Sequence, residues 1–293
     1  MDKIIIKRVQ IEGLWNKYNI DFLLEQDVNI LVGNNGVGKT TILNIILSIL
    51  AGKPAGDISY TSARIEFSKD YTAVVETEND KKVLVWKCND KQVGAEEVPL
   101  RSMAFSSFDK PFYTDTIREK IRAMHDDISS ELDMTLYNTI DAYYRYKSNL
   151  GTIIRDMIAH GTMEDLNTVY AQADMAKKIC DSLFSDKTWY EDKEGRLLFK
   201  TNEDGAILRP SQLSSGEKQL LLLILKTLVA QSTIALWDEP EISLHVAWQQ
   251  KLISTMRELN PNMQLIIATH SPSILYDGWE QRAINVNRIK TKA

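Results

Sequence analysis

The chain has 293 residues, which is enough for one large α/β domain or for one domain with a subdomain. Its formal net charge of −5 does not indicate nucleic-acid binding by the whole protein, although a local basic patch stays compatible with that charge. Cys88 and Cys180 lie far apart in no CxxC pattern, which favours free thiols in a reducing cytosol over a disulfide framework or a thiolate metal site. The longest apolar run, Leu220–Leu225, is far shorter than the roughly 20 residues of a membrane span, so we expect a cytoplasmic protein without a membrane segment.

The first part of the chain predicts strands that lead into a glycine-rich loop. Ile4–Ile11 is rich in β-branched residues, and Ile20–Leu24 fits a second short strand. Val28–Val32 is a continuous apolar run, which is typical of a strand buried on both faces. It runs directly into Gly33, and a helix over Lys39–Leu50 follows, so we expect a strand–loop–helix junction here.

The middle of the chain changes from strands to helices. Polar turns separate strand-like segments, which predict an antiparallel meander over Ala63–Ser68, Thr72–Glu78 and Lys82–Cys88, followed by a strand at Ser102–Phe105. Residues 114–184 lack proline and predict helices over Thr116–Ala123, Leu132–Ser148, Ile153–His160 and Glu164–Leu183, with breaks at Gly151 and Gly161. The polar stretch after them holds one short strand, at Leu197–Lys200.

The last hundred residues alternate helices with apolar strands. The helices are expected over Ser215–Ala230 and His245–Leu259, and the strands over Thr233–Trp237, Met263–Ala268 and Ala283–Val286. This alternation predicts an α/β fold with a mostly parallel sheet. We expect residues 1–113 to form the N-terminal part of that fold with an antiparallel β subdomain, 114–186 a helical insert, and 187–293 the C-terminal part.

The glycine-rich loop matches the pattern GxxxxGK[ST], which binds nucleoside triphosphates. Its glycines permit close approach of the backbone, and the following helix N-terminus adds positive potential. Lys39 is expected to bridge the β- and γ-phosphates of ATP, and the Thr40 hydroxyl to ligate Mg²⁺. The residues expected to bind the nucleotide are Asn34, Asn35, Gly36, Val37, Gly38, Lys39, Thr40 and Thr41.

The second motif is acidic and stands at the end of the apolar strand that begins near Ile234. Asp238 is expected to reach Mg²⁺, and Glu239 is expected to polarise the water that attacks the γ-phosphate. The preceding Trp237 fits a core aromatic of a buried strand.

A third motif, Leu213–Gln219, resembles the signature motif of ABC-type ATPases and precedes a helix. In that family, the motif binds the γ-phosphate held by the other protomer of a head-to-tail dimer. The resemblance therefore implies that Ser214, Ser215, Gly216 and Glu217 act in trans, in a dimer or a higher even oligomer.

Two further motifs follow in the order of the family. Ala268–Pro272 places His270 where the family has a switch histidine that contacts the γ-phosphate. Pro240–His245 occupies the D-loop position, with Ser243 and Leu244 as the candidates for an interface.

One position departs from the pattern of transporter subunits, and the residue that stacks on adenine is left open between three aromatics. Ala104–Phe108 has no glutamine at the expected Mg²⁺-reading position, where Ser106 or Ser107 would stand instead. The aromatic expected to stack on adenine is Trp15, Tyr18 or Phe22.

The neighbourhood of Glu239, with Trp248 and Gln249 after it, resembles the OLD-like, RecF-like and SMC-like branch of the family, which works in DNA repair, chromosome organisation and anti-phage defence. The chain shows no TOPRIM nuclease segment and no long coiled coil. We therefore expect an ATPase that regulates a separate effector, such as a nuclease or toxin, as in Septu-like systems and some retrons. A transporter nucleotide-binding subunit and a non-enzymatic ATP-dependent clamp are the alternatives.

Basic residues of the helical region alternate with acids, which indicates either solvated helix faces or a surface for nucleic acid or a partner. They are Arg118, Lys120, Arg122, Arg145, Lys147, Arg155, Lys177 and Lys178.

Overall fold

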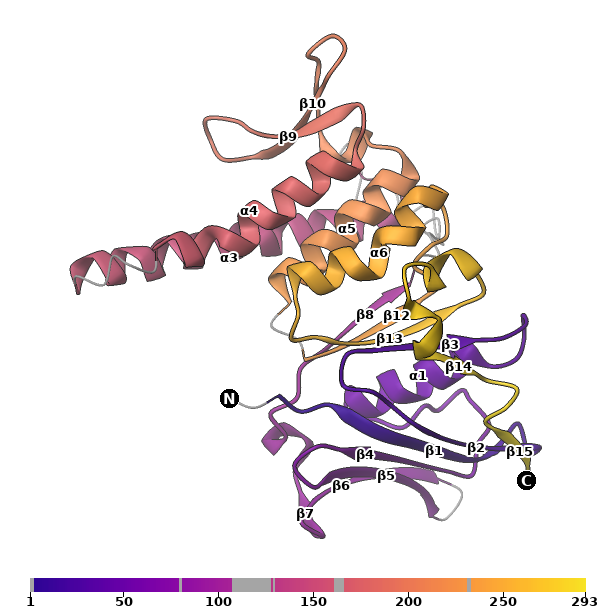
Figure 1. Cartoon of the computed structure of the whole chain (residues 1–293). Coiled ribbons are helices and arrows are strands. Elements are labelled where there is room, and N and C mark those ends of the chain that lie inside the picture. Colours follow the sequence, from indigo (N-terminus) through magenta and orange to yellow (C-terminus); the bar gives the residue numbers. More distant parts are fainter. Residues whose placement is uncertain (1–2, 79–80, 107–127, 129, 161–165, 231–232) are drawn as a thin grey trace. The chain divides into compact units, whose positions relative to one another are not determined.

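The computed structural model describes residues 3–78, 81–106, 128, 130–160, 166–230 and 233–293 (Figure 1). The chain divides into two compact units. The first comprises Met1–Ser106, Gln231–Glu241 and Pro261–Ala293, and the second comprises Ser107–Ala230 and Ile242–Asn260. The predicted helix at Thr116–Ala123, Ser107 and the basic residues Arg118, Lys120 and Arg122 lie outside the described residues.

The first unit contains a five-stranded sheet whose neighbouring strands all pair in parallel. Its order is β14 (Ala283–Asn285), β3 (Val28–Val32), β13 (Gln264–Thr269), β12 (Ile234–Asp238) and β8 (Ser102–Ser106). All residues of β12 and β13 are buried, as their continuous apolar sequences predict. The predicted α/β fold with a mostly parallel sheet is therefore confirmed.

The register of this sheet brings the carboxyl ends of its strands to one edge. Asp238 lies opposite Ser106 on one side and Ala268 on the other, and Thr269 lies opposite Val32. The loops that follow β3, β12 and β13 therefore leave the sheet side by side, which is where open α/β sheets bind ligands.

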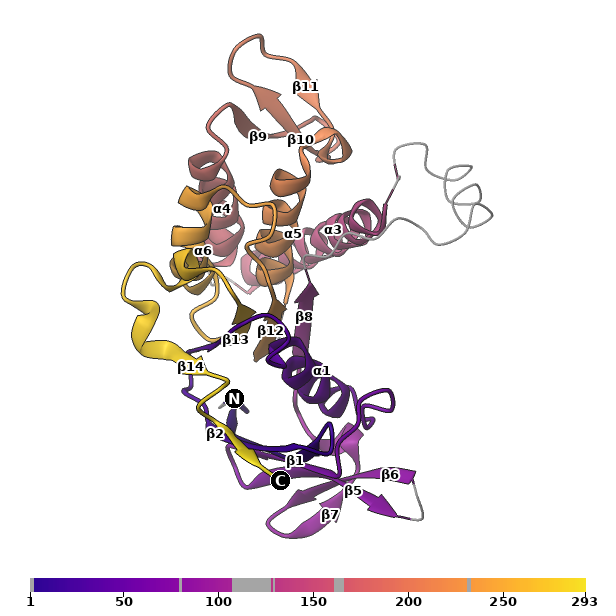
Figure 2. The same cartoon turned by 90° about the vertical axis from the view of Figure 1, so that its right-hand side faces the viewer.

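A second sheet of the first unit is antiparallel. Its order is β15 (Lys290–Lys292), β2 (Tyr18–Leu23), β1 (Ile6–Leu14), β4 (Ser62–Phe67), β5 (Tyr71–Glu78), β6 (Lys81–Cys88) and β7 (Lys91–Val93). Helix α1 (Lys39–Leu50) lies between the two sheets (Figures 1 and 2), and its buried isoleucines join the core formed with β1 and β12. The predicted meander is confirmed within this sheet.

The second unit is built mainly of helices: α3 (Glu131–Ala159), α4 (Leu166–Leu183), α5 (Ser215–Val229) and α6 (Val246–Leu259). Helices α4, α5 and α6 pack against one another (Figure 2). The prediction that Gly151 breaks a helix was wrong, since α3 runs through it. Glycine costs only about 1 kcal/mol against alanine inside a helix, and Tyr143 and Leu150 bury apolar surface of α3 just before the expected break. Gly161 lies outside the described residues.

The stretch expected to hold one strand forms a three-stranded antiparallel sheet of β11 (Ile207–Leu208), β10 (Leu197–Thr201) and β9 (Lys187–Glu191). The strand β9 has a polar sequence with one core residue, Trp189, which is buried against Phe199 of β10. Cys88 and Cys180 are free, as predicted. Among the described helices, none has both the length and the apolar character that crossing a bilayer demands.

Candidate nucleotide-binding and hydrolysis site

The glycine-rich loop connects β3 to α1 and has the backbone of an anion cradle. Gly33, Gly36 and Gly38 have φ values of 151°, 76° and 104°, which side-chain-bearing residues rarely adopt. Gly38 is the N-cap of α1 and, as a glycine, supplies no side-chain cap to the first N–H groups of the helix. These N–H groups stay available to a phosphate, and the helix dipole favours negative charge there.

Lys39 begins α1 and is folded back over its own loop. Its side chain is only 5% exposed, and its Nζ donates to the carbonyl oxygen of Gly33 at 3.0 Å and of Asn34 at 3.5 Å. The same nitrogen lies 3.8 Å from Glu239 Oε1. A buried ammonium held this way is a ready counter-charge for a phosphate.

Thr40 and Asp238 form the part of the site that suits a metal ion. The Thr40 hydroxyl donates to Asp238 Oδ1 at 2.9 Å. Burial raises the pKa of Asp238 above its ordinary value, while the hydrogen bond from Thr40 acts in the opposite direction. Hydroxyl and carboxylate oxygens are the ligands that Mg²⁺ prefers, so the donor set fits this ion.

Glu239 follows Asp238 and is held in a fixed orientation by its neighbours. Its φ is +48°, a strained value for a non-glycine residue, and its backbone N–H donates to the Ala268 carbonyl at 2.8 Å. Its Oε2 accepts a hydrogen bond from the His270 N–H at 3.2 Å and lies 2.6 Å from His270 Nδ1. The His270 side chain is 50% exposed, so it is accessible to a ligand while it contacts Glu239.

Glu241 is a member of this cluster that the sequence did not single out. It is 3% exposed, and oxygen or nitrogen atoms of Glu239, Glu241 and His270 lie within 4.8 Å of one another. Thr269, at the end of β13, donates its hydroxyl proton to Glu241 Oε1. A second carboxyl after an expected catalytic glutamate is the signal that would have identified it.

The predicted signature residues lie in the second unit, at the start of α5. Ser214 caps the helix and exchanges hydrogen bonds with Glu217: its N–H and hydroxyl each donate to Glu217 Oε2 at 2.8 Å. Lys187 of β9 also donates to Glu217, at 2.7 Å from Oε1. Burial would raise the pKa of Glu217, but the hydrogen bonds from Lys187 and Ser214 outweigh it and hold that pKa below its ordinary value. The contact of Lys187 with Glu217 joins residues that lie 30 positions apart and was not predicted.

Gly216 lies directly against the predicted D-loop. A β-carbon at this position would stand 2.3 Å from the carbonyl oxygen of Ser243, so only glycine fits without a shift of the backbone. Ser243 itself has a φ of +68°. The next residues fix the loop at its other end, because His245 caps α6 through Ala247 N–H.

The structure narrows the three aromatic candidates for an adenine contact. Phe22 is buried in the core at 6% exposure. Trp15 lies against the glycine-rich loop, since a β-carbon at Gly38 would be 2.8 Å from its ring. Trp15 and Tyr18 pack edge to face, and Lys290 lies over both rings at 5.1 and 4.7 Å from the ring centres.

Two of the five basic residues of the helical region that fall within the described chain form ion pairs with acids. Arg145 pairs with Asp141 at 2.9 Å, and Lys147 pairs with Glu191 at 2.5 Å. Arg155 donates to Thr152, whereas Lys177 and Lys178 are exposed. This arrangement favours solvated, self-neutralised helix faces at Arg145 and Lys147.

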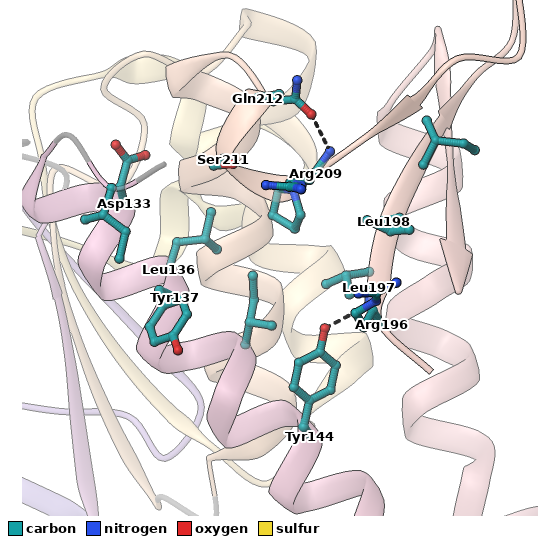
Figure 3. Close-up of a pocket in the computed structure, with 14 residues that line it drawn as sticks. Asp133, Leu136, Tyr137, Tyr144, Arg196, Leu197, Leu198, Arg209, Ser211 and Gln212 are labelled. Atoms are coloured by element: carbon teal, nitrogen blue, oxygen red, sulfur yellow. Dashed lines mark hydrogen bonds between the residues drawn. The ribbon is translucent and has the colours of Figure 1, made fainter. Parts of the chain in front are cut away.

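A pocket of about 500 Å³ also opens on the second unit (Figure 3). Tyr137 and Tyr144 of α3 face Leu197 of β10 across it, and Tyr144 accepts a hydrogen bond from the Leu197 N–H at 2.8 Å. One wall is Pro210–Gln212, which directly precedes the signature motif.

The parallel sheet, the glycine-rich loop and the acidic strand end together define a P-loop ATPase domain. A family model described as "AAA domain, putative AbiEii toxin, Type IV TA system" matches residues 100–275, and a second, described as "AAA domain", matches residues 8–138. Because the first match covers more than half of the chain, the chain belongs to this family of AAA-type ATPases.

Relatives and solved structures agree with that assignment. The chain is 26% identical over 147 residues to the retron Vc95 probable ATPase of Vibrio cholerae serotype O1 biovar El Tor, covering 44% of this chain and 29% of the relative. It is 21% identical over 305 residues to the Septu protein PtuA of Bacillus thuringiensis, covering 93% and 73%. The match thus spans less than a third of the retron protein and most of PtuA.

The fold has a match among solved ATPase heads. The Smc head domain from Pyrococcus furiosus, solved with an extended coiled coil and the C-terminal domain of ScpA, superposes with a TM-score of 0.55 at 12% identity, over 99% of this chain and 96% of that chain. The predicted ATPase fold, like that of an SMC head, is therefore confirmed.

Proposed function

We propose that the chain binds ATP with Mg²⁺ on Gly33–Thr41 and hydrolyses it in a head-to-tail dimer that controls a separate effector. The observation that carries the hydrolysis proposal is the convergence of Lys39, Asp238, Glu239 and His270 at one edge of the parallel sheet. These groups supply a cation for phosphate, ligands for a metal, and a carboxylate that can accept a proton from water.

Each residue has a distinct part in the reaction. Lys39 leaves the carbonyl oxygens of its own loop and bridges the phosphates. Thr40 and Asp238 hold Mg²⁺, which when bound neutralises charge on the phosphates. Glu239 accepts the proton of the attacking water, and His270 orients Glu239 and faces the γ-phosphate. Ser106 lies beside Asp238 in the register and takes the position that a glutamine has in transporter subunits.

The signature residues complete the site from the second protomer. Ser214 and the N-terminus of α5 offer a hydroxyl and backbone N–H groups to the γ-phosphate. Because Gly216 has no side chain, the backbone of the D-loop packs directly against it. A conformational change at one ATP site of the dimer can therefore reach the other ATP site through Ser243.

Complementation of two inactive variants tests the dimer. Lys39→Ala removes the P-loop cation, and Ser214→Arg fills the signature, so each variant alone should release no phosphate from ATP. A mixed dimer contains one site with neither substitution, so an equal mixture should recover roughly a quarter of the wild-type rate. A mixture as inactive as its components would contradict the composite site.

The effector proposal rests on the relationship to retron and Septu proteins. Affinity purification from the native host, with and without ATP, should recover a nuclease or toxin with the wild-type chain. The recovery should depend on ATP with wild-type protein and be lost with Lys39→Ala. A chain that elutes alone under both conditions would contradict this part of the proposal.

A further inference from the structure

Glu217 carries a negative charge at the place where the signature motif is proposed to meet a phosphate. Its side chain is 10% exposed, and its Oε2 accepts from both the N–H and the hydroxyl of Ser214 at 2.8 Å. A phosphate oxygen that accepts the Ser214 hydroxyl proton would lie within about 6 Å of that Oε2, two hydrogen-bond lengths away. Two anions at this distance repel each other, and more strongly where water is excluded. An uncompensated Glu217 would therefore oppose the proposed binding of the γ-phosphate.

Lys187 of β9 compensates this charge at the other oxygen of the carboxylate. Its Nζ donates to Glu217 Oε1 at 2.7 Å, and its side chain is 12% exposed. Burial alone would lower the pKa of Lys187, but its hydrogen bonds to Asp186 and Glu217 raise that pKa above its ordinary value. Asp186 lies 2.7 Å from the same nitrogen, but its side chain is 66% exposed, so water screens its charge. The buried partner of Lys187 is thus Glu217.

The fold holds Lys187 in this place independently of the signature motif. Two positions further along β9, the Trp189 N–H donates to Asp181 Oδ1 of α4 at 2.6 Å, and the Trp189 ring packs against Phe199 of β10. The cation next to Glu217 in the chain, Lys218, is engaged with Asp133 of α3 at 2.7 Å. The counter-charge of Glu217 therefore comes from the hairpin of β9 and β10.

Ser214 has one hydroxyl proton, for which two acceptors would compete in the ATP-bound dimer. In this structure the proton is directed to Glu217 Oε2, and the hydroxyl oxygen accepts from the Glu217 N–H at 3.4 Å. When the proton turns to a phosphate, Glu217 loses that hydrogen bond. It keeps the Ser214 N–H and Lys187 as donors, so its carboxylate is not left buried without a partner. Lys187 thereby lowers the cost of turning the hydroxyl.

We infer that Lys187 is a positioning residue of the signature motif, which cancels the charge of Glu217 so that Ser214 can donate its hydroxyl to the γ-phosphate of ATP on the other protomer. Lys187 does not contact the nucleotide; it acts through Glu217. This inference rests on the proposed head-to-tail dimer. It gives strand β9 a part in ATP binding, although this strand belongs to none of the predicted motifs.

Two substitutions break the same ion pair and separate the effect of charge from the effect of pairing. Lys187→Met leaves Glu217 charged beside the phosphate, so it should weaken ATP-driven dimer formation by about ten-fold or more. Glu217→Gln removes the charge and keeps an acceptor for Ser214, because glutamine also serves in a capping box. Glu217→Gln should therefore form the ATP-bound dimer several-fold more tightly than Lys187→Met does.

Two further variants should rescue the dimer. Lys187→Arg keeps the positive charge, so it should dimerise more tightly than Lys187→Met. Lys187→Met combined with Glu217→Gln has no charge at either position, so it should recover most of the dimer affinity that Lys187→Met loses.

Lys147→Met is the matched control. Lys147 Nζ lies 2.5 Å from Glu191 Oε2, so this substitution breaks an ion pair at the other end of the same strand, β9. Because Glu191 has no contact with the signature motif among the described interactions, dimer formation should be the same as in the parent protein. A weakened dimer in this control as well would mean that any lost ion pair of β9 has the effect, which would overturn the role of Lys187.

The quantity to measure is the dimer dissociation constant, from sedimentation equilibrium with saturating Mg²⁺ and ATP. The parent protein and every variant carry Glu239→Gln, so that ATP is not consumed. The temperature is kept below the thermal unfolding midpoint of each variant. Titration with a fluorescent ATP analogue should give the same Kd for Lys187→Met and the parent, because the P-loop is intact in both.

The expected result is a weak dimer for Lys187→Met and tighter dimers for Lys187→Arg, Glu217→Gln and the double variant. Equal dimerisation of Lys187→Met and the parent would overturn this inference alone. Equal weakening by Lys187→Met and Glu217→Gln would show that the ion pair only holds the fold, and would overturn it too. If Lys187→Met does not fold, a Glu217→Gln protein that binds ATP and stays monomeric would overturn the charge role. A parent that binds ATP and stays monomeric would instead contradict the proposed dimer, and the inference with it.

Discussion

The hydroxyl of Thr40 lies 2.9 Å from Asp238 Oδ1, although 198 residues separate the two in the chain. The contact arises because β3 and β12 end at the same edge of the parallel sheet, each next to β13. Residues that are distant in sequence therefore form one donor set beside the P-loop lysine, Lys39.

Replacing Lys39 with alanine should weaken ATP binding by about 10- to 100-fold, because it removes charge-assisted hydrogen bonds to the phosphates. Titration with a fluorescent ATP analogue measures the change in Kd. Lys53→Ala is the matched control, since Lys53 is an exposed lysine just beyond α1. Equal affinity in the two variants would contradict the assignment of Lys39.

Replacing Gly216 with alanine should disrupt the signature loop. The new β-carbon would stand 2.3 Å from the Ser243 carbonyl oxygen, so the backbone of α5 or of the D-loop must shift. Overpacking of this kind costs about 1–3 kcal/mol. ATP should still bind, because the P-loop is unchanged, but ATP hydrolysis should be lost.

The control for that variant is Gly151→Ala. Gly151 lies inside α3 with open space around its α-carbon, so alanine should raise the free energy of unfolding by about 0.5–1 kcal/mol. Normal hydrolysis by Gly216→Ala would contradict the role of the signature loop, whatever the control shows.

Replacing Trp15 with alanine should raise the Kd for ATP by about ten-fold, and Trp15→Phe should restore most of the affinity, because stacking on a base needs only an aromatic face. Trp15 is the candidate because its ring lies against Gly38 of the P-loop. Equilibrium binding of ATP against a non-aromatic triphosphate separates stacking from phosphate contacts. If Trp15→Ala lowers affinity for both ligands equally, the ring does not stack on adenine.

The ion pair between Lys187 and Glu217 should make stability depend on pH. The folded-state pKa of Glu217 is below its ordinary value of 4.5, so the stabilisation is present above that pH and is lost as the pH falls through the folded-state pKa. Lys187→Met should lower the free energy of unfolding by about 1–3 kcal/mol at pH 7 and by much less at acid pH. Urea unfolding at a series of pH values from 7 down through the titration of Glu217 in the folded protein measures the difference, with exposed Lys200→Met as the control. A loss that stays the same while Glu217 becomes protonated in the folded protein would contradict the electrostatic explanation.

Local patterns predicted the parallel sheet and the P-loop because both are encoded by contiguous residues. The bounds of β3 and α1 agree with the prediction. Both elements are rich in apolar residues, and the polar glycine-rich loop between them marks where one ends and the other begins. The β9 strand was missed because only Trp189 faces the core. Glu241 and Lys187 were missed because their partners lie far away in sequence, and only the folded sheet and hairpin bring them together.

Sedimentation velocity of Glu239→Gln with and without Mg²⁺ and ATP tests the central claim most directly. The substitution removes the base but keeps the P-loop and the signature, so ATP should bind without being hydrolysed and hold two chains together. We predict a shift from monomer to dimer on addition of ATP, and no shift when Lys39→Ala is added to the same chain. A Glu239→Gln protein that binds ATP and sediments as an unchanged monomer would contradict the head-to-tail dimer.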